Sequence, residues 1–532
     1  MMPLFWFVLL PILIGVLTYL LGADKSKYLT LFFQAFFLAM AFINFSNIKL
    51  QGAVSENLGG FPQGIGITLY CDNIASVLML LNIFLFTCMI VFNIHKNYMN
   101  KLFLFLFLIL QGLLNGIFLS NDLFNLYVLI DLATIVVSIL IMFKKDSRSI
   151  YDGMVYLLVN IVAMLFFLLG VGYVYKIFGV LDMGLIQEKM NLVTDTRVLI
   201  LPYCFLMTAV GLKAAIMPLF SWLPRAHGTP SAPSIVSAIL SGLYVKGGLY
   251  LFIRIQNIFE PTLKTQSLFL LLGFFTAIVG FIFALSQTDI KLILAYHTVS
   301  QIGLIIFGLS IGHIESYWGS IYHILNHAVF KSVLFLTAGI IIEVYQTRDI
   351  RLIQGVFKRM PFVSIITIIA ILGITGAPLF NGSISKYFIQ RGTTSLLEYG
   401  LIIINLGTVM SFVKYSSIFK GSIDAPVHKI PVNQKVVTSL LAGICFLGGI
   451  FGAKMIGYLF NVTVIVSFAG YVQKSVIYII SLIVGFLFYK YAYKRIPLFK
   501  KIRDIELSFP SLCLSIVVFF SGLLAYMMII TA

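Results

Sequence analysis

The sequence predicts an all-α polytopic membrane protein that crosses the bilayer about 16 times, and two observations support this prediction. The chain of 532 residues is 60% hydrophobic and only 10% charged, whereas soluble domains are roughly 45–50% apolar and about 25% charged. Apolar runs of about 20 residues, the length that crosses a hydrocarbon core, recur along the whole chain. A soluble fold would expose large apolar patches to water, which excludes that class.

The first apolar run is interpreted as a retained helix, because it has no basic segment before it and no clear small-residue cleavage site before Asp24. The polar stretches between the runs are short and are expected to form loops rather than a catalytic domain. The expected spans are about 3–22, 28–46, 72–94, 100–120, 123–143, 151–178, 197–224, 231–256, 266–286, 290–311, 316–344, 361–390, 398–419, 434–460, 474–493 and 508–530.

The net charge of +17 indicates orientation rather than binding to nucleic acid. If the N-terminus lies outside, the loops alternate between the two sides, and most Lys and Arg residues then fall in inner loops, as the positive-inside rule requires. Lys454 and Lys474 are among the few basic residues that this scheme assigns to outer loops. An even number of spans places both termini on the outer side of the cell membrane.

Two proline-containing segments predict broken helices and an internal repeat. The sequences AIMPLF at 215–220 and APLF at 377–380 place Pro218 and Pro378 near the middle of spans 7 and 12. A proline inside a helix removes a backbone hydrogen bond, and paired broken helices point to a repeat whose interface carries the site. Because five spans separate them, the two repeats are expected to be inverted five-helix units, helices 4–8 and 9–13.

This repeat divides the chain into four parts. Residues 1–96 hold three N-terminal spans, 97–260 the first repeat and 261–425 the second. Residues 426–532 hold three C-terminal spans, and within them the basic segment 494–507 is expected to lie along the membrane interface or to form a simple loop.

Titratable side chains stand deep inside several spans, where a charge costs roughly 2.5–3.5 kcal/mol on insertion scales. The three on span 11 follow one another at intervals of four residues and so form one stripe on a helix. Lys291 and Lys414 lie near span ends and are interpreted as side chains that reach the interface. The deep residues are Asp131, Lys213, Lys246, His323, His327, Lys331 and Lys386.

Such a row of groups predicts a proton path. Burial disfavours the charged form of a lysine, and a nearby carboxylate restores it. Asp131 is the expected partner of Lys213, so that the proton on Lys213 is held when the pair is close and released when it separates. The path needs no cofactor. No metal site is predicted either, because the five cysteines show no ligand spacing and no acidic ligand lies near His323 and His327 in the sequence.

Several segments together resemble one family, the antiporter-like subunits of respiratory complex I, membrane-bound hydrogenases and Mrp-type sodium/proton antiporters. The similar segments cover about residues 70–420. They are NDLFNLYVLIDL at 121–132, KAAIMPLFSWLPRAHGTPSAPSIVSAILSGLYVKGGLYLFIR at 213–254, DIKLILAYHTVSQIG at 289–303, HILNHAVFKSVLFLTAGII at 323–341 and GAPLFNGSISK at 376–386.

The resemblance implies fourteen core helices, two inverted repeats and a central polar axis. It maps the family's helix-5 acid to Asp131, its helix-7 and helix-8 lysines to Lys213 and Lys246, and its helix-12 lysine to Lys386. The family's helix-11 pair maps to His327 and Lys331. The chain departs from the family in three ways: Asp131 replaces the usual glutamate, Arg225 stands where many relatives have an acid, and residues beyond about 430 add two helices.

The resulting hypothesis is a subunit that moves protons within a redox complex such as a complex I-like NADH:quinone oxidoreductase or a membrane-bound hydrogenase, without redox chemistry of its own. The alternative is an Mrp-type Na+/H+ antiporter subunit that is not linked to redox chemistry. The expected partners are other membrane subunits, including homologous antiporter-like ones, the lipid bilayer, H+ and, as a second ion, Na+. Two weaker alternatives are a cytochrome b-type protein that uses His297 with His323 or His327, and a membrane transferase that uses loop 345–360.

Overall fold

The computed structural model describes residues 2–228, 232–421, 426–505 and 508–531. Fourteen helical segments among them are long and apolar enough to cross a membrane. Two further apolar helices, α1 (Trp6–Leu20) and α16 (Pro361–Thr375), have 15 residues each. The structure therefore confirms an all-α polytopic fold, whereas it does not confirm the predicted count of sixteen spans.

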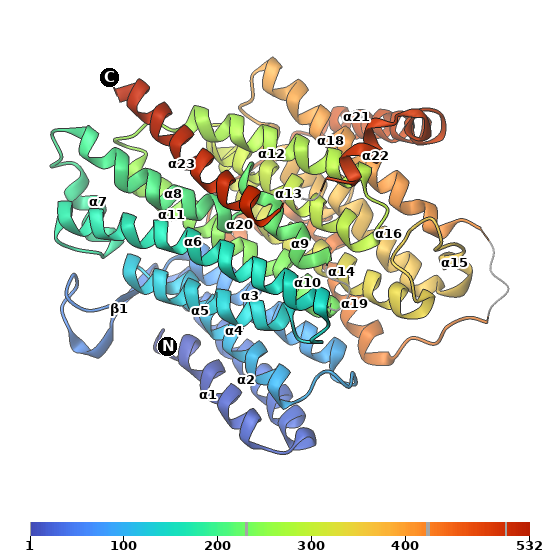
Figure 1. Cartoon of the computed structure of the whole chain (residues 1–532), viewed down its shortest axis with the longest axis horizontal. Helices are drawn as coiled ribbons and strands as arrows, with labels where there is room; N and C mark the ends of the chain where they lie inside the picture. Colours follow the sequence, from blue (N-terminus) through green and yellow to red (C-terminus); the bar gives the residue numbers. More distant parts are fainter. Residues whose placement is uncertain (1, 229–231, 422–425, 506–507, 532) are drawn as a thin grey trace.

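The N-terminal half consists of helices that lie side by side in one bundle, with a small β-hairpin at one end (Figure 1). In the hairpin, β1 (Val54–Asn57) pairs antiparallel with β2 (Thr68–Cys71). The helices after α1 are α2 (Ala23–Gln51), α3 (Asn73–Asn93), α4 (Lys101–Leu119), α5 (Leu123–Ile141), α6 (Ser147–Phe178), α7 (Met183–Met190), α8 (Ile200–Lys213), α9 (Trp222–Gly228), α10 (Ser234–Ile239), the π-helical η4 (Leu240–Tyr244) and α11 (Val245–Phe259).

The C-terminal half continues the bundle and ends in helices at its periphery (Figure 1). Its helices besides α16 are α12 (Gln266–Ser286), α13 (Ile290–Leu309), α14 (Ile314–Tyr345), α15 (Val356–Arg359), α17 (Asn381–Gln390), α18 (Ser395–Tyr415), α19 (Val432–Ile450), α20 (Gly452–Phe460), α21 (Phe468–Leu487), α22 (Leu498–Arg503) and α23 (Phe509–Thr531). Short 3-10 or π turns are η1 (Leu58–Gly60), η2 (Thr196–Leu199), η3 (Leu219–Ser221), η5 (Ser416–Phe419), η6 (Phe488–Ala492) and η7 (Tyr493–Arg495).

Polar side chains before the first turn explain where several helices begin. The first N–H groups of a helix have no partner within it, and Asp or Asn at the N-cap supplies one. The carboxylates of Asp72, Asp122 and Asp146 accept from the N–H groups of Ala75, Asn125 and Ser149 at the starts of α3, α5 and α6. Three of the few acidic residues of the chain therefore mark the starts of these helices.

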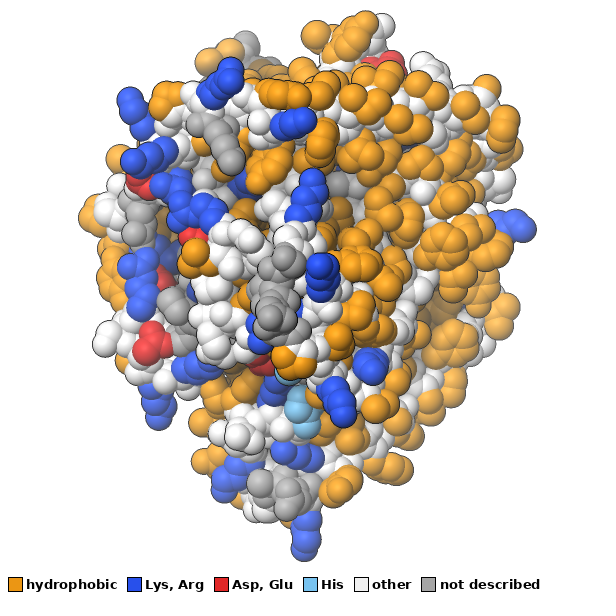
Figure 2. All heavy atoms as spheres, turned by 90° about the vertical axis from the view of Figure 1, so that its right-hand side faces the viewer, with side chains coloured by type: hydrophobic (Ala, Val, Ile, Leu, Met, Phe, Trp, Pro, Cys, Tyr) orange, Lys and Arg blue, Asp and Glu red, His pale blue; other side chains and the backbone are white. Residues whose placement is uncertain are grey.

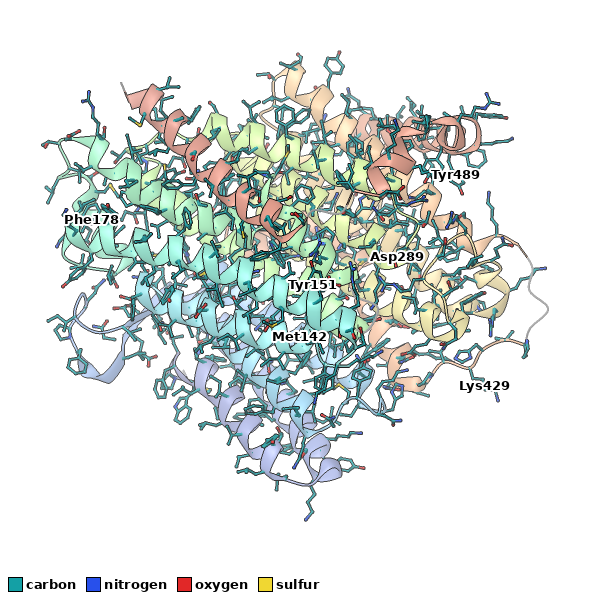
Figure 3. All side chains as sticks on the ribbon, in the orientation of Figure 1. Met142, Tyr151, Phe178, Asp289, Lys429 and Tyr489 are labelled. Carbon is teal, nitrogen blue, oxygen red and sulfur yellow. The ribbon has the colours of Figure 1, made fainter. Side chains whose placement is uncertain are left out.

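The bundle has two chemically different ends. The hairpin end carries β1 and β2, and Phe178 lies there (Figure 3). The turn near 260 lines a cavity with Ser55 and Tyr70 of the hairpin, and His313 lines one cavity with this turn and another with the turn near 392. At the opposite end, which we call the basic end and near which Lys429 and Tyr489 lie, many Lys and Arg side chains gather while apolar side chains cover the flank (Figures 2 and 3).

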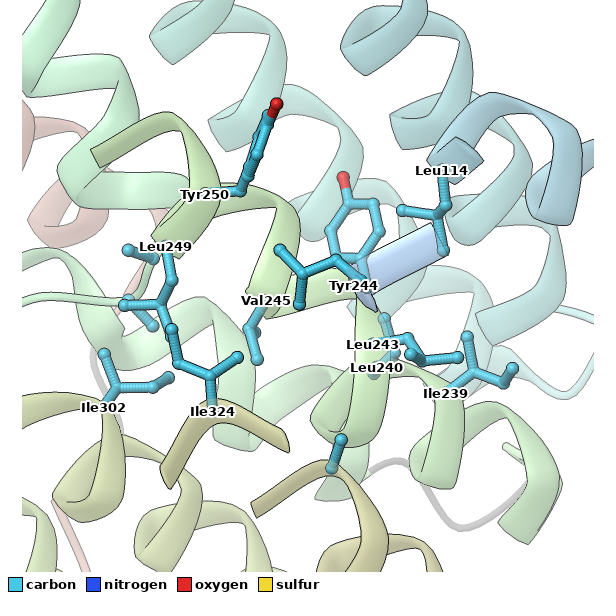
Figure 4. Close-up of a cluster of buried hydrophobic side chains, with 14 of the residues drawn as sticks. Leu114, Ile239, Leu240, Leu243, Tyr244, Val245, Leu249, Tyr250, Ile302 and Ile324 are labelled. Atoms are coloured by element: carbon cyan, nitrogen blue, oxygen red, sulfur yellow. The ribbon is translucent and has the colours of Figure 1, made fainter. Parts of the chain in front are cut away.

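The centre of the bundle is the segment from α10 through η4 to α11. Every residue in its most apolar stretch is buried inside the protein, whereas α21 and α23 are mostly exposed and fit a lipid-facing periphery. Leu249 lies near Ile302 and Ile324, and Tyr244 lies near Leu114 (Figure 4). The one lysine of this segment, Lys246, is therefore buried inside the protein.

Two helical spans are each broken into two helices just before a proline. Helix α8 ends at Lys213, five residues before Pro218, and the chain resumes in α9. Helix α16 ends at Thr375, and α17 begins at Asn381 after Pro378. The division of the chain into two inverted repeats around these breaks stays a prediction.

Side chains from neighbouring helices bind the backbone groups that the breaks release. The N–H of Met217 donates to Oγ1 of Thr276 (3.0 Å), and the N–H of Leu379 donates to the hydroxyl of Tyr471 on α21 (2.9 Å). Irregular backbone inside a membrane needs such partners, because no water is available to replace them. Helix α21, near the C-terminus of the chain, thus packs against the second break.

The basic segment 494–507 forms part of η7 and the short helix α22, and its last two residues lie outside the described residues. Helix α22 packs against α12 of the bundle. The assignment of Lys474 to an outer loop was wrong, because Lys474 lies inside α21, almost two turns after its first residue.

Candidate functional site

Six of the seven titratable residues predicted for the path are buried, and α8, α11, α14 and α17 carry them. The four lysines are at most 6% exposed, and both histidines are fully buried. A buried charge is costly unless it is paired or hydrogen-bonded, so their polar contacts decide what they can do. The six are Lys213, Lys246, His323, His327, Lys331 and Lys386.

Lys213 stands at the C-terminus of α8 and bonds to three helices. Its Nζ donates to Oγ1 of Thr134 (2.6 Å), to Oδ1 of Asn160 (2.8 Å) and to the hydroxyl of Tyr244 (3.4 Å). The hydroxyl of Tyr156 donates to that of Tyr244 (2.8 Å). Neutral oxygen atoms therefore surround the amine, and they can accept from it whether or not it carries the extra proton.

The expected ion pair between Asp131 and Lys213 is absent from this structure. Among the described residues Asp131 makes no hydrogen bond or ion pair, and it is partly exposed at the surface of α5. Thr134, about one turn further along α5, accepts a hydrogen bond from Nζ of Lys213 instead. An aspartate is one methylene shorter than the glutamate that the resemblance implied here, so its carboxylate reaches less far from α5. Its role in the path stays a prediction.

Lys246 and His327 face each other at the centre of the bundle. Nζ of Lys246 lies in a very short contact with Nδ1 of His327 and donates to the carbonyl oxygen of Ser241 (2.5 Å). Ser241 belongs to η4, and π-helical turns occur frequently at functional sites. The Nε2 atom of His327 is buried without a partner among the described residues, so a water molecule or a proton there would meet an unused nitrogen.

A line of hydroxyl and carbonyl groups joins Lys246 to Lys331. The hydroxyls of Ser241 and Thr298 are 2.7 Å apart, and that of Thr298 donates to the carbonyl of Leu294 (3.1 Å). Nζ of Lys331 donates to the same carbonyl (2.6 Å). These short contacts connect η4 and the start of α11 with α14 through α13.

A second line leads from α14 towards Lys386. The ring of His323 contacts Oγ of Ser385 (2.8 Å) and Oε1 of Gln301 (3.0 Å). The next residue, Lys386, donates to the carbonyl of Ile374 (2.7 Å), which the break after α16 leaves free, and to Oδ1 of Asn405 (2.8 Å). The broken helix therefore supplies an acceptor that an intact helix would have used internally.

Two further histidines accompany the path and were not predicted as part of it. His227 on α9 and His297 on α13 are fully buried, and all four ring nitrogens lack partners among the described residues. Each ring stacks on a phenylalanine, Phe335 or Phe412. Buried unpaired nitrogens are uncommon and often mark water sites. Both histidines lie in the similar segments, which was the available signal.

Lys291 and Lys414 also differ from the expectation that they reach the interface. Both are nearly fully buried. Lys414 donates to the carbonyls of Ala284, Leu285 and Gln287 at the end of α12, and Lys291 donates to that of Ala232 (2.8 Å). Lys414 thus binds carbonyls at the C-terminus of α12, where a positive charge is favourable, whereas Lys291 binds a carbonyl that lies just before the start of α10.

A cavity of about 250 Å³ opens near the first break on the side of the basic end. Its lining includes Arg225 of α9 and the buried carboxylate of Asp152. Nε of Arg225 lies 4.0 Å from Asp152, and Nε of Arg148 lies 3.1 Å from it. Arg225, which stands where the resemblance implied an acidic residue, thus lies beside an acidic residue of α6, Asp152.

The family comparison matches residues 120–411 to the family described as NADH:quinone oxidoreductase/Mrp antiporter, TM. That range includes all seven predicted path residues. Among curated relatives, the D subunit of the Na(+)/H(+) antiporter of Alkalihalophilus pseudofirmus is 31% identical over 348 residues, 64% of this chain and 70% of the relative. Its namesake from Bacillus subtilis is 28% identical over 397 residues, 73% of this chain and 80% of the relative.

Two solved structures share the fold. A chain of the Mrp complex from Dietzia sp. DQ12-45-1b superposes with a TM-score of 0.79 at 21% identity, covering 90% of this chain and 98% of that one. A chain of the membrane-bound sulfane sulfur reductase, an archaeal respiratory membrane complex, gives 0.79 at 22% identity, with 91% and 99% covered. At these identities the likeness concerns the fold.

Proposed function

We propose that this chain, which belongs to the NADH:quinone oxidoreductase/Mrp antiporter transmembrane family, is the D-type component of a multi-subunit Na+/H+ antiporter and moves protons along its buried polar line. The preferred order of the two hypotheses from the sequence is thereby reversed. The curated relatives are named as components of Na+/H+ antiporters, and nothing in the chain itself favours a redox complex over a gradient-driven one.

The observation that supports the proposal best is the continuity of polar contacts from Lys246 to Lys331. Two buried amines share a path of hydroxyl and carbonyl oxygens, with His327 in contact with the first amine. The hydroxyls of Ser241 and Thr298 can both accept and donate a proton, whereas the carbonyls of Ser241 and Leu294 only accept, so water bound beside these carbonyls would complete the transfer between the two amines. Lys213 would load this line from the first repeat, and His323 and Lys386 would receive the proton in the second.

The direction of the path follows from the distribution of charge. Lys and Arg side chains gather at the end opposite the hairpin (Figure 2), and such residues favour the cytoplasmic side. We therefore propose that the basic end faces the cytoplasm and that both termini, like the hairpin, lie outside. Asp131, partly exposed on α5, would face lipid or a neighbouring subunit, from which it would modulate Lys213.

The proposal is tested with the complete complex in inverted membrane vesicles of a host that lacks its own sodium/proton antiporters. Addition of Na+ is expected to dissipate a preformed proton gradient, read by a fluorescent pH probe. Lys213→Ala should reduce the rate at least about tenfold, because one proton-transfer group contributes on the order of 10²–10⁴-fold.

Lys176→Ala is the matched control, because this lysine is exposed near the end of α6 and lies off the path; its rate should equal that of the unchanged complex. The proposal is contradicted if Na+ leaves the gradient intact in vesicles that contain the assembled complex, or if Lys213→Ala transports at the normal rate.

A further inference from the structure

We propose that Lys474 on α21 is a further proton-transfer residue, which takes the proton from Lys386 and delivers it to the hairpin end. This inference rests on the proposed proton path. It concerns a residue beyond the region that the family description matches, which ends at 411. The placement of α21, the cavities beside it and the groups that face Lys474 all support it.

Helix α21 presents a polar face to the second helix break. Its three buried residues are Tyr478, Ser481 and Gly485, and Lys474 precedes Tyr478 by four residues, so it lies on the same face. The hydroxyl of Tyr478 is 3.1 Å from that of Thr375, the last residue of α16. Lys474 therefore faces α17 and α18 although most of α21 is exposed.

Tyr471, three residues before Lys474, also joins α21 to the second helix break. The hydroxyl of Tyr471 accepts from the N–H of Leu379 (2.9 Å) and lies 2.9 Å from Oγ of Ser383. Tyr471 and Tyr478 thus bind the chain on both sides of Pro378. Lys474 lies between these two tyrosines in α21. It is therefore placed beside the same helix break whose free carbonyl, that of Ile374, accepts from Lys386.

Two cavities meet at Lys474. The inner one has a volume of about 40 Å³, and both lysines, Lys386 and Lys474, line it together with Asn405 and Tyr478. That volume holds a few water molecules, each of which needs about 10–15 Å³ of such space. The outer one, of about 290 Å³ at the hairpin end, is lined by Lys474 and Gln390 as well, and its wall includes Glu398. Lys474 therefore separates the interior from the outer opening.

The charged groups around Lys474 favour this direction. Lys386 stands on the inner side, and a second ammonium group beside it repels its proton. Glu398 stands on the outer side, where its Oε1 accepts from Nε2 of Gln390 (2.5 Å). Nζ of Lys474 lies 5.9 Å from the ring centre of Tyr387. The other acidic, basic or histidine side chains that line the outer cavity are Glu315, Arg391 and His313, of which the first two form an ion pair (2.8 Å).

The step is a simple proton exchange. The ammonium group of Lys386 gives a proton through water to the neutral amine of Lys474, which leaves Lys386 neutral and Lys474 charged. Lys474 then releases the proton to water in the outer cavity beside Glu398 and becomes neutral again. No other reactant is needed.

Three substitutions in the complete complex test the inference in the same Na+-driven vesicle assay. Lys474→Met keeps most of the side-chain length but cannot carry a proton, and Lys474→Arg keeps the charge but does not release its proton. Both are expected to lower the rate at least about tenfold. Lys474→His, which exchanges protons near neutrality, should retain part of the rate with a maximum at lower pH. Lys454→Met, on an exposed position of α20, is the control.

Normal transport by Lys474→Met, or by Lys474→Arg, would overturn the inference, since the first would make the side chain dispensable and the second would reduce its role to a fixed charge. Assembly of each variant is checked by native electrophoresis, and Lys474→Arg provides a test in a variant that keeps size and charge. If Lys386→Ala stops transport while Lys474→Met does not, the proposed function stands and only this inference fails. If Lys386→Ala also transports normally, the proposed path itself fails.

Discussion

Lys246→Ala is expected to stop Na+-driven proton movement, with a loss of about 100-fold or more. Lys246 contacts His327 and begins the polar line to Lys331, so its removal takes away the amine that links the two halves of the path. The loss should appear in the rate of transport, measured with the complete complex in inverted vesicles, while the amount of assembled complex stays unchanged.

Lys246→Arg provides a stricter test of the same position, because it keeps the charge and removes the ability to release a proton. It should also be inactive. Lys358→Ala, an exposed lysine of α15, should transport normally. A Lys246→Arg complex with normal transport would show that a fixed charge suffices there, which contradicts a relay.

Asp152→Asn is expected to have the largest effect on stability. Asp152 is almost fully buried beside Arg225 and within reach of Arg148. Removing one member of a buried charge pair costs about 3–5 kcal/mol, since the remaining charge is left in the interior. The midpoint of thermal aggregation of the detergent-solubilised complex should fall by several degrees.

Arg148→Ala is the matched control, because half of this side chain is exposed and its charge is solvated, and because Asp152 keeps Arg225 as a partner when Arg148 is removed. Its midpoint should stay close to that of the unchanged protein. Equal midpoints for Asp152→Asn and the unchanged protein would mean that the carboxylate does not stabilise Arg225.

The sequence predicted the all-α polytopic fold and the burial of six candidate path residues, since both depend on simple physical costs. A run of apolar residues crosses the bilayer whatever its neighbours are, and lysines such as Lys246 and Lys331 are too expensive in a membrane to be placed at random. The helix ends at Lys213 and Thr375 lie before Pro218 and Pro378, where the missing N–H groups interrupt the helix.

The contacts of these residues could not be predicted, because they depend on which helices pack together. On α5, Lys213 bonds to Thr134 rather than to Asp131, and these two residues are only about one turn apart. Lys474 was assigned to an outer loop because the expected span began at about residue 474, whereas α21 begins at Phe468. His227 and His297 carry no local pattern that distinguishes a histidine beside a path from one that merely packs.

A water-resolving cryo-EM map of the assembled complex is the most direct test of a hydrated proton line through the bundle. Ordered water is expected between Lys213 and Lys246, at Nε2 of His327, beside the unpaired nitrogens of His227 and His297, and in the cavity between Lys386 and Lys474. A map that shows dry, apolar packing between these side chains, with no ordered water linking one amine to the next, would contradict proton transfer along them.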